Sequence, residues 1–134
     1  MFDLKKIIQR ENVGFNRELG IHLLDVCDSF ARAEIEIEEK HLNPFGIVHG
    51  GCIFSLMDTV GGIAACTQGN AVTTSSCSVS FLNAGSGKKL IAQAEKIKNG
   101  KNLLVYDVTV TDENETLIAK STLTYFKLPI DISL

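Results

Sequence analysis

The chain has 134 residues, a length that suits a single domain with a hydrophobic core of its own. Its formal net charge of −3 and sequence pI of about 5.6 give no general affinity for nucleic acid. The sequence shows neither a signal peptide nor an apolar segment as long as a membrane span, so we expect a cytoplasmic protein without membrane contact.

The N-terminal third predicts one short helix and two strands. Residues 2–11 carry apolar side chains at helical spacing, which indicates a short amphipathic helix. Residues 15–20 are expected to be a connector, and residues 21–27 a strand. Residues 31–38 alternate strictly between apolar and charged side chains, so we expect a half-buried strand with one solvated, acidic face.

A turn-rich loop at residues 41–51 precedes an apolar run at residues 52–66. Asp58 is the only charged residue of that run, so we expect a buried helix that carries one acid. Such an acid is a candidate functional residue, because burial perturbs the ionisation of a carboxylate. The apolar residues that recur at helical spacing are Ile53, Leu56, Met57, Val60 and Ala64.

The start of this expected helix could bind a carbonyl oxygen. Its first N–H groups have no partner within the helix and carry partial positive charge, and glycine lets a substrate approach closely. The amide of Gly50 or Gly51 could therefore act as an oxyanion hole does. Gly50 and Asp58 are eight residues apart, about 12 Å along a helix, so Asp58 would face the Gly50 amide of a second chain in a two-fold dimer.

Histidine and cysteine give no metal or redox motif. His41 and His49 are eight residues apart with no third ligand at metal spacing, so we expect no metal site. The four cysteines form no C-x-x-C pair and are expected to be reduced and buried. Cys52 could be a nucleophile, but a small packed hydrophobe is the better interpretation.

Four strands are expected after the helix, at residues 72–82, 89–98, 101–111 and 116–127. The first contains a run of hydroxyl side chains at residues 73–76, which could line a tunnel, position water or serve only as strand residues. Asn99 and Gly100 signal a hairpin. Short links make the four strands largely antiparallel neighbours, and an antiparallel sheet around one apolar helix is an α+β fold.

These features resemble the hotdog-fold acyl-CoA thioesterases, in the branch of the phenylacetic-acid-pathway thioesterase. The resemblance rests on the order Asn-Pro-x-Gly-x-x-His-Gly-Gly at residues 43–51, with an acid eight residues after Gly50. It implies one α+β hotdog thioesterase domain over residues 1–134, in which an antiparallel sheet wraps around one long buried helix. It also implies an acyl-CoA substrate, no cofactor, and a homodimer that pairs further into a dimer of dimers.

The resemblance assigns catalytic roles by matching position. Asp58 resembles the acid that works as general base or as nucleophile, and Gly50 the residue whose amide binds the thioester carbonyl. Asn43 resembles the side chain that helps to hold the carbonyl or the water. His49 resembles the histidine beside the thioester, and Thr74 is a weaker match to a hydroxyl that orients water.

The substrate-binding residues are less specific. Gly51 offers a second amide at the helix start, and Phe81 would shape any acyl pocket. Lys98, Gly100 and Lys101 lie at the hairpin where relatives often place a basic residue against CoA phosphates, although a solvated hairpin fits the same residues. In many relatives a basic residue and a proline follow the strand that corresponds to residues 72–82. This chain instead has Asn-Ala-Gly at residues 83–85.

Other function classes stay open. No G-x-S-x-G motif is present, which argues against an α/β-hydrolase. A hotdog enoyl-CoA hydratase or dehydratase would also use a histidine and an acid near a glycine-rich helix start, although the spacing around His49 fits it less well. A non-catalytic acyl-CoA-binding module is the third candidate, and Asp58 counts against it. Aromatic and short to medium aliphatic acyl groups are both compatible with the sequence.

Overall fold

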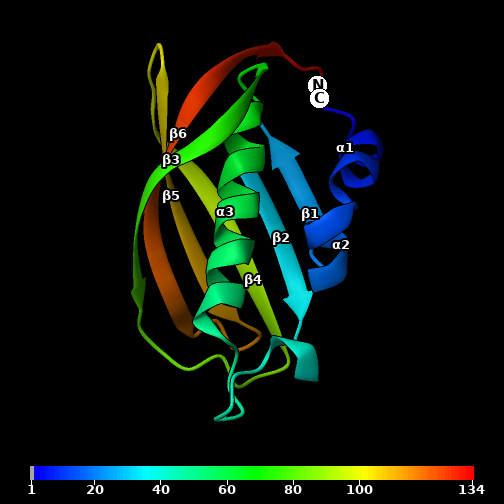
Figure 1. Ribbon diagram of the computed structural model, residues 1–134, viewed down its shortest axis with the longest axis vertical. Helices are drawn as coiled ribbons and strands as arrows, with labels where there is room; N and C mark the ends of the chain where they lie inside the picture. Colours follow the sequence, from blue (N-terminus) through cyan, green and yellow to red (C-terminus); the bar gives the residue numbers. More distant parts are fainter. Residues whose placement is uncertain (1) are drawn as a thin grey trace.

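One long helix lies against one face of an antiparallel sheet in the computed structural model, which describes residues 2–134 (Figure 1). Two short helices lie beside the first strand. This arrangement confirms the predicted α+β fold around a buried helix. In chain order the elements are α1 (Leu4–Glu11), α2 (Gly14–Leu19), β1 (His22–Cys27), β2 (Phe30–Glu36), a 3-10 helix (Glu39–His41), α3 (Gly50–Cys66), β3 (Asn70–Phe81), β4 (Lys89–Asn99), β5 (Leu103–Asp112) and β6 (Leu117–Asp131).

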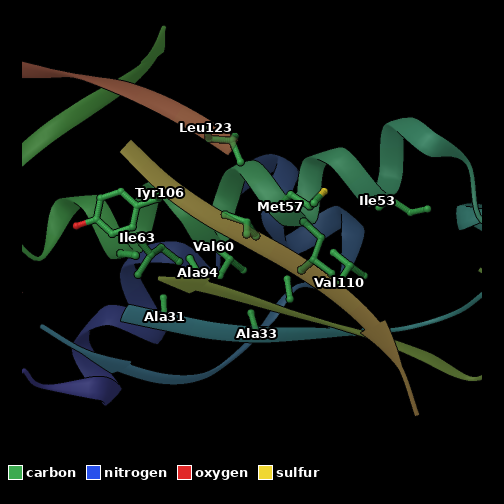
Figure 2. Close-up of a cluster of buried hydrophobic side chains, with 14 of the residues drawn as sticks. Ala31, Ala33, Ile53, Met57, Val60, Ile63, Ala94, Tyr106, Val110 and Leu123 are labelled. Carbon is green, nitrogen blue, oxygen red and sulfur yellow. The ribbon is translucent and has the colours of Figure 1, made fainter. Parts of the chain in front are cut away.

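The core forms between α3 and the inner face of the sheet. The five apolar residues expected at helical spacing on α3 are all buried, and strands β2, β4 and β5 bury alternate residues against them. Figure 2 shows Met57 and Val60 of α3 among side chains from these strands. Fully buried alanines leave room for α3 to lie close to the sheet: Ala31, Ala33, Ala92 and Ala94.

The four strands after α3 are antiparallel neighbours, as expected, but they do not follow one another in chain order. Strands β4, β5 and β6 are antiparallel neighbours, but β3 pairs with β6 rather than with β4, whose other edge is occupied by β2. The six-stranded sheet therefore has the order β1-β2-β4-β5-β6-β3. Strand β3 lies at one edge and, within residues 2–134, has a pairing partner on one side only.

Helix α2 occupies the segment for which a connector is predicted. Gly20 ends the helix in the left-handed conformation with φ of 75°, and its N–H donates to the carbonyls of Asn16 and Arg17. No side chain caps the start of the helix, so the usual start signal is missing from the sequence. No helix between residues 2 and 134 is long and apolar enough to cross a membrane.

The cysteines are all free, but the prediction that they are buried is correct only for Cys52. Cys66 is half-buried, and Cys27 and Cys77 are exposed. Cys77 belongs to β3 and pairs in register with the buried Leu123. Cys77 lies in the middle of β3, which is the edge strand of the sheet.

Candidate active site

The loop before α3 is folded by the side chain of Asn43. Its Oδ1 accepts the N–H groups of Phe45 and Ile47, at 2.9 and 3.3 Å, and Gly46 adopts a left-handed conformation with φ of 82°. The Asn43 carbonyl oxygen is therefore committed to the loop. Its NH₂ group is the part of the side chain that a substrate could use.

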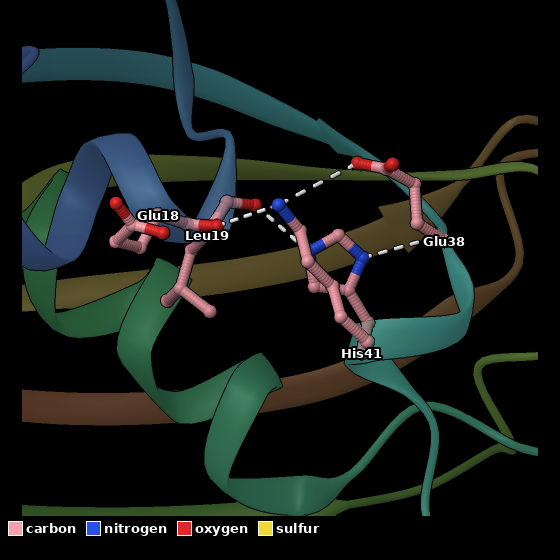
Figure 3. Close-up of polar contacts among 5 residues, drawn as sticks. Glu18, Leu19, Glu38 and His41 are labelled. Carbon is pink, nitrogen blue, oxygen red and sulfur yellow. Dashed lines mark hydrogen bonds and ion pairs between the residues drawn. The ribbon is translucent and has the colours of Figure 1, made fainter.

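His41 anchors the start of this loop in the core (Figure 3). Its Nδ1 accepts the N–H of Glu38 at 2.9 Å, and its Nε2 lies 2.8 Å from the carbonyl oxygen of Leu19. The ring therefore carries its proton on Nε2. The His41 carbonyl accepts the N–H of His49 at 2.8 Å, so this buried histidine links α2 to the start of α3. Residues 2–134 contain no group of three His, Cys, Asp or Glu placed to hold a metal ion.

His49 caps α3 and selects which glycine amide stays free. Its Nδ1 accepts the N–H of Gly51 at 2.8 Å, so the neutral ring carries its proton on Nε2. The Gly50 N–H has no acceptor within the described residues. Of the two amides considered from the sequence, Gly50 therefore offers the free donor at the positive end of the helix.

Phe81 forms an apolar wall beside this free amide. The ring lies 3.6 Å from the position that a Cβ on Gly50 would occupy, although Gly50 begins α3 and Phe81 ends β3. The ring is 53% exposed, so it also faces solvent. The structure thus brings Phe81, His49, Gly50 and Gly51 together at one end of α3.

Asp58 lies about two turns further along α3, where hydroxyl groups from two strands hold its carboxylate. The Thr74 hydroxyl of β3 donates to Asp58 Oδ1 at 2.7 Å. The Tyr125 hydroxyl of β6 lies 3.2 Å from the same Oδ1 and 3.0 Å from the main-chain oxygen of Asp58. Oδ2 has no hydrogen-bond partner in the described part of the chain. One carboxylate oxygen is therefore approached by two hydroxyl groups, and the other accepts no hydrogen bond from the described residues.

Sequence reasoning missed Tyr125. Its ring is buried, and Gly61 leaves the space for its hydroxyl, because a Cβ on Gly61 would overlap the Tyr125 oxygen. Burial, followed by the charge of Asp58, raises the pKa of Tyr125, so the hydroxyl keeps its proton and acts as a donor. Tyr125 is opposite Thr74 in the β3–β6 register. The position of Tyr125 beside Thr74 and Asp58 is evident only once the pairing of β3 with β6 is known.

Asp58, Thr74 and Tyr125 line a hollow of about 210 Å³ between the N-terminal helices, α3 and β3. Glu11 and Asn16 contribute to its opposite wall. Burial raises the pKa of Glu11, which the charge of Arg10 partly offsets. The hollow beside Asp58 therefore has polar groups on both sides.

A second hollow, of about 420 Å³, lies at the start of α3 beside His49. Phe15, Leu19 and Leu42 contribute apolar walls. Cys52 also lines it, but burial raises the pKa of its thiol and so disfavours the reactive thiolate. The interpretation of Cys52 as a packed hydrophobe agrees with this environment.

The basic hairpin lies at the opposite end of α3 from Gly50 (Figure 1). Asn99 bonds the Ser29 hydroxyl, and the Ser29 N–H bonds the hydroxyl of Thr67, which follows the last residue of α3. Gly100 has a structural role, because a Cβ there would lie 2.7 Å from a main-chain oxygen of the hairpin. Within one chain the structure does not bring Lys98, Gly100 or Lys101 to the Gly50 amide.

The chain is similar to known thioesterases in both sequence and structure. The family model described as Thioesterase superfamily matches residues 45–119. The chain is 33% identical over 110 residues to the acyl-coenzyme A thioesterase PaaI of Escherichia coli, covering 81% of this chain and 79% of the relative. The solved structure of the E. coli PaaI protein from the phenylacetic acid degradation operon has a TM-score of 0.90 and 27% identity, over 97% of this chain and 95% of that chain.

One solved structure with a fold similar to that of this chain contains a bound ligand. It is a Streptococcus mutans protein bound to acetyl-CoA, with a TM-score of 0.80 and 27% identity, over 84% of this chain and 91% of that chain. These similarities confirm the hotdog thioesterase resemblance that rests on residues 43–51 and Asp58.

Proposed function

The chain belongs to the thioesterase superfamily, and we propose that it hydrolyses an acyl-CoA thioester to a free acid and CoA. One observation carries the proposal. Asp58, the single acid of α3, has one carboxylate oxygen held by hydroxyl groups and the other without a partner in the described residues. The acyl-CoA thioesterase activity in the name of the E. coli relative and the acetyl-CoA on the S. mutans neighbour support the choice of substrate.

The proposed chemistry needs one donor and one base or nucleophile. The Gly50 N–H binds the thioester carbonyl oxygen and stabilises the negative charge that develops there. Asp58 either takes a proton from the attacking water or attacks the carbonyl carbon itself, forming an anhydride that water then hydrolyses. In both routes the carbon–sulfur bond breaks and the sulfur leaves as a thiolate. The Nε2–H of His49 and the NH₂ of Asn43 are donors that can approach the sulfur or the carbonyl.

We propose that each site is shared between two chains. Gly50 and Asp58 are about 12 Å apart on one helix, too far to act on one carbonyl group. Pairing of the free β3 edge with the same strand of a second copy would cover the exposed Phe81 and set the two α3 helices antiparallel. Asp58 would then face Gly50 of the partner subunit. The partner's hairpin would also come to the same end as Gly50, where Lys98 and Lys101 could meet CoA phosphates.

Thiol release from a panel of acyl-CoAs tests the function. The wild type should turn over at least one member, and Asp58→Asn, at matched folded concentration, should lose about 10²-fold or more of the activity. A wild type that binds acyl-CoA without turnover would favour a binding module, and hydration of an enoyl-CoA would favour a hydratase. Full activity in Asp58→Asn would make that acid structural.

Mixing two inactive variants tests the shared site. Asp58→Asn and Gly50→Pro each remove one of the two proposed groups. A heterodimer of the two would hold one site with both defects and one intact site, so random pairing should restore about a quarter of the wild-type activity. No recovery, with heterodimers demonstrated by mass, would place both groups of a site on one chain.

A further inference from the structure

We infer that Tyr125 is a positioning residue that fixes the rotation of the Asp58 carboxylate, so that Oδ2 is the oxygen that performs the chemistry. The inference rests on the proposed thioesterase function and names which atom of Asp58 reacts. Thr74 and Tyr125 approach the same Oδ1, at 2.7 and 3.2 Å, from neighbouring strands. A carboxylate with both donors on one oxygen cannot rotate without breaking them.

The Tyr125 hydroxyl shares its single proton between the carboxylate and the helix backbone. It also lies 3.0 Å from the main-chain oxygen of Asp58, so it is tied to the helix backbone as well as to the side chain. The ring is buried between β6 and α3. Thr74 makes the shorter bond but is exposed, so the buried Tyr125 hydroxyl is the second donor that keeps the carboxylate in one orientation.

Gly61 is the second part of this arrangement. Glycine in a helix interior costs about 1 kcal/mol relative to alanine. At this position, however, a Cβ would overlap the Tyr125 oxygen and crowd Val108. Gly61 therefore admits the hydroxyl to the Asp58 turn of α3. Because burial and the neighbouring Asp58 raise the pKa of Tyr125, the hydroxyl is a constant donor and exchanges no proton with the substrate.

Tyr125→Phe tests the inference, with Tyr106→Phe as the matched control. Tyr106 is also fully buried and donates its hydroxyl to Asn99 Oδ1 at 2.8 Å, away from Asp58. We expect both variants to lose similar stability. Only Tyr125→Phe should lower kcat, by about tenfold, with little change in KM.

Gly61→Ala provides a second route to the same result while retaining the tyrosine. The added methyl should displace the Tyr125 hydroxyl and reproduce the loss of kcat. The Gly61→Ala, Tyr125→Phe double variant should lose less than the product of the two single effects, because both act on one contact. If Tyr125→Phe does not fold, the Gly61→Ala kinetics decide the question.

The experiments distinguish a failure of the positioning role of Tyr125 from a failure of the proposed thioesterase function. An active wild type in which Tyr125→Phe has the same kcat and KM as Tyr106→Phe would overturn the positioning role alone. A Gly61→Ala variant with unchanged kcat would also overturn it. A wild type without any turnover on the acyl-CoA panel would overturn the proposed function, and the assignment of Oδ2 with it.

Discussion

Replacement of Gly50 by proline removes one hydrogen-bond donor and leaves the start of α3 intact. Gly50 is the first residue of the helix, a position that tolerates proline because its N–H makes no bond within the helix. The preceding His49 has φ of −60° and ψ of 134°, the extended conformation that proline requires of its neighbour. A Cβ at Gly50 would lie 3.6 Å from the Phe81 ring, an ordinary contact. We therefore expect the fold to survive.

The expected effect on catalysis is large. Loss of one donor that binds a developing oxyanion reduces kcat by about 10² to 10³-fold, equivalent to about 2.7–4 kcal/mol. KM should change little, because the donor acts more strongly on the transition state than on the bound substrate. The neighbouring Gly51 cannot replace it, since its N–H is bonded to His49 Nδ1 at 2.8 Å.

The assay is steady-state thiol release from the best acyl-CoA of the panel, with melting temperatures measured alongside. Gly50→Ala is the control, because it adds the same Cβ but keeps the N–H. Gly50→Ala should remain active while Gly50→Pro loses most of its kcat. If the two folded variants are equally active, the thioester carbonyl is not bound by this amide and the reasoning about the helix start is wrong.

Four further predictions follow from individual contacts. Cys52→Ala should keep its activity, because burial raises the pKa of the thiol; loss of turnover in the folded variant would make Cys52 the nucleophile. Burial also raises the pKa of Glu11, so the folded state favours the protonated carboxyl group. The stability that this group contributes is present below its unfolded-state pKa and is lost as the pH rises through its folded-state pKa. Glu11→Gln should therefore gain melting temperature relative to the wild type near neutral pH but not in acid, and an equal difference at both would contradict this. His41→Ala should lower the free energy of unfolding in urea by about 2 kcal/mol or more, because both ring nitrogens are hydrogen-bonded in the core; a smaller loss would show that the loop has another anchor. Lys98→Ala combined with Lys101→Ala should raise KM for acyl-CoA and weaken its salt dependence at constant kcat, whereas an unchanged KM would leave the hairpin as a solvated turn.

Local periodicity was enough to predict most elements of the fold. The apolar spacing around Asp58 predicts α3, and the strict alternation at residues 31–38 predicts β2, because each pattern reports the face that one element buries. Helix α2 was missed for the same reason: it has no buried residue and no capping side chain at its start, and Gly20 at its end marks a turn equally well.

The class of fold, the helix with its single acid and the histidine–glycine–glycine start that relates this chain to the thioesterases can therefore be read from the sequence. The hydrogen-bond partners of these groups become visible in the folded chain. The pairing of β3 with β6 brings Tyr125 to Asp58, and the orientation of the His49 ring occupies Gly51 and frees Gly50. The Tyr125–Asp58 contact depends on strand order, and the His49–Gly51 bond depends on the orientation of one side chain, neither of which local apolar patterns encode.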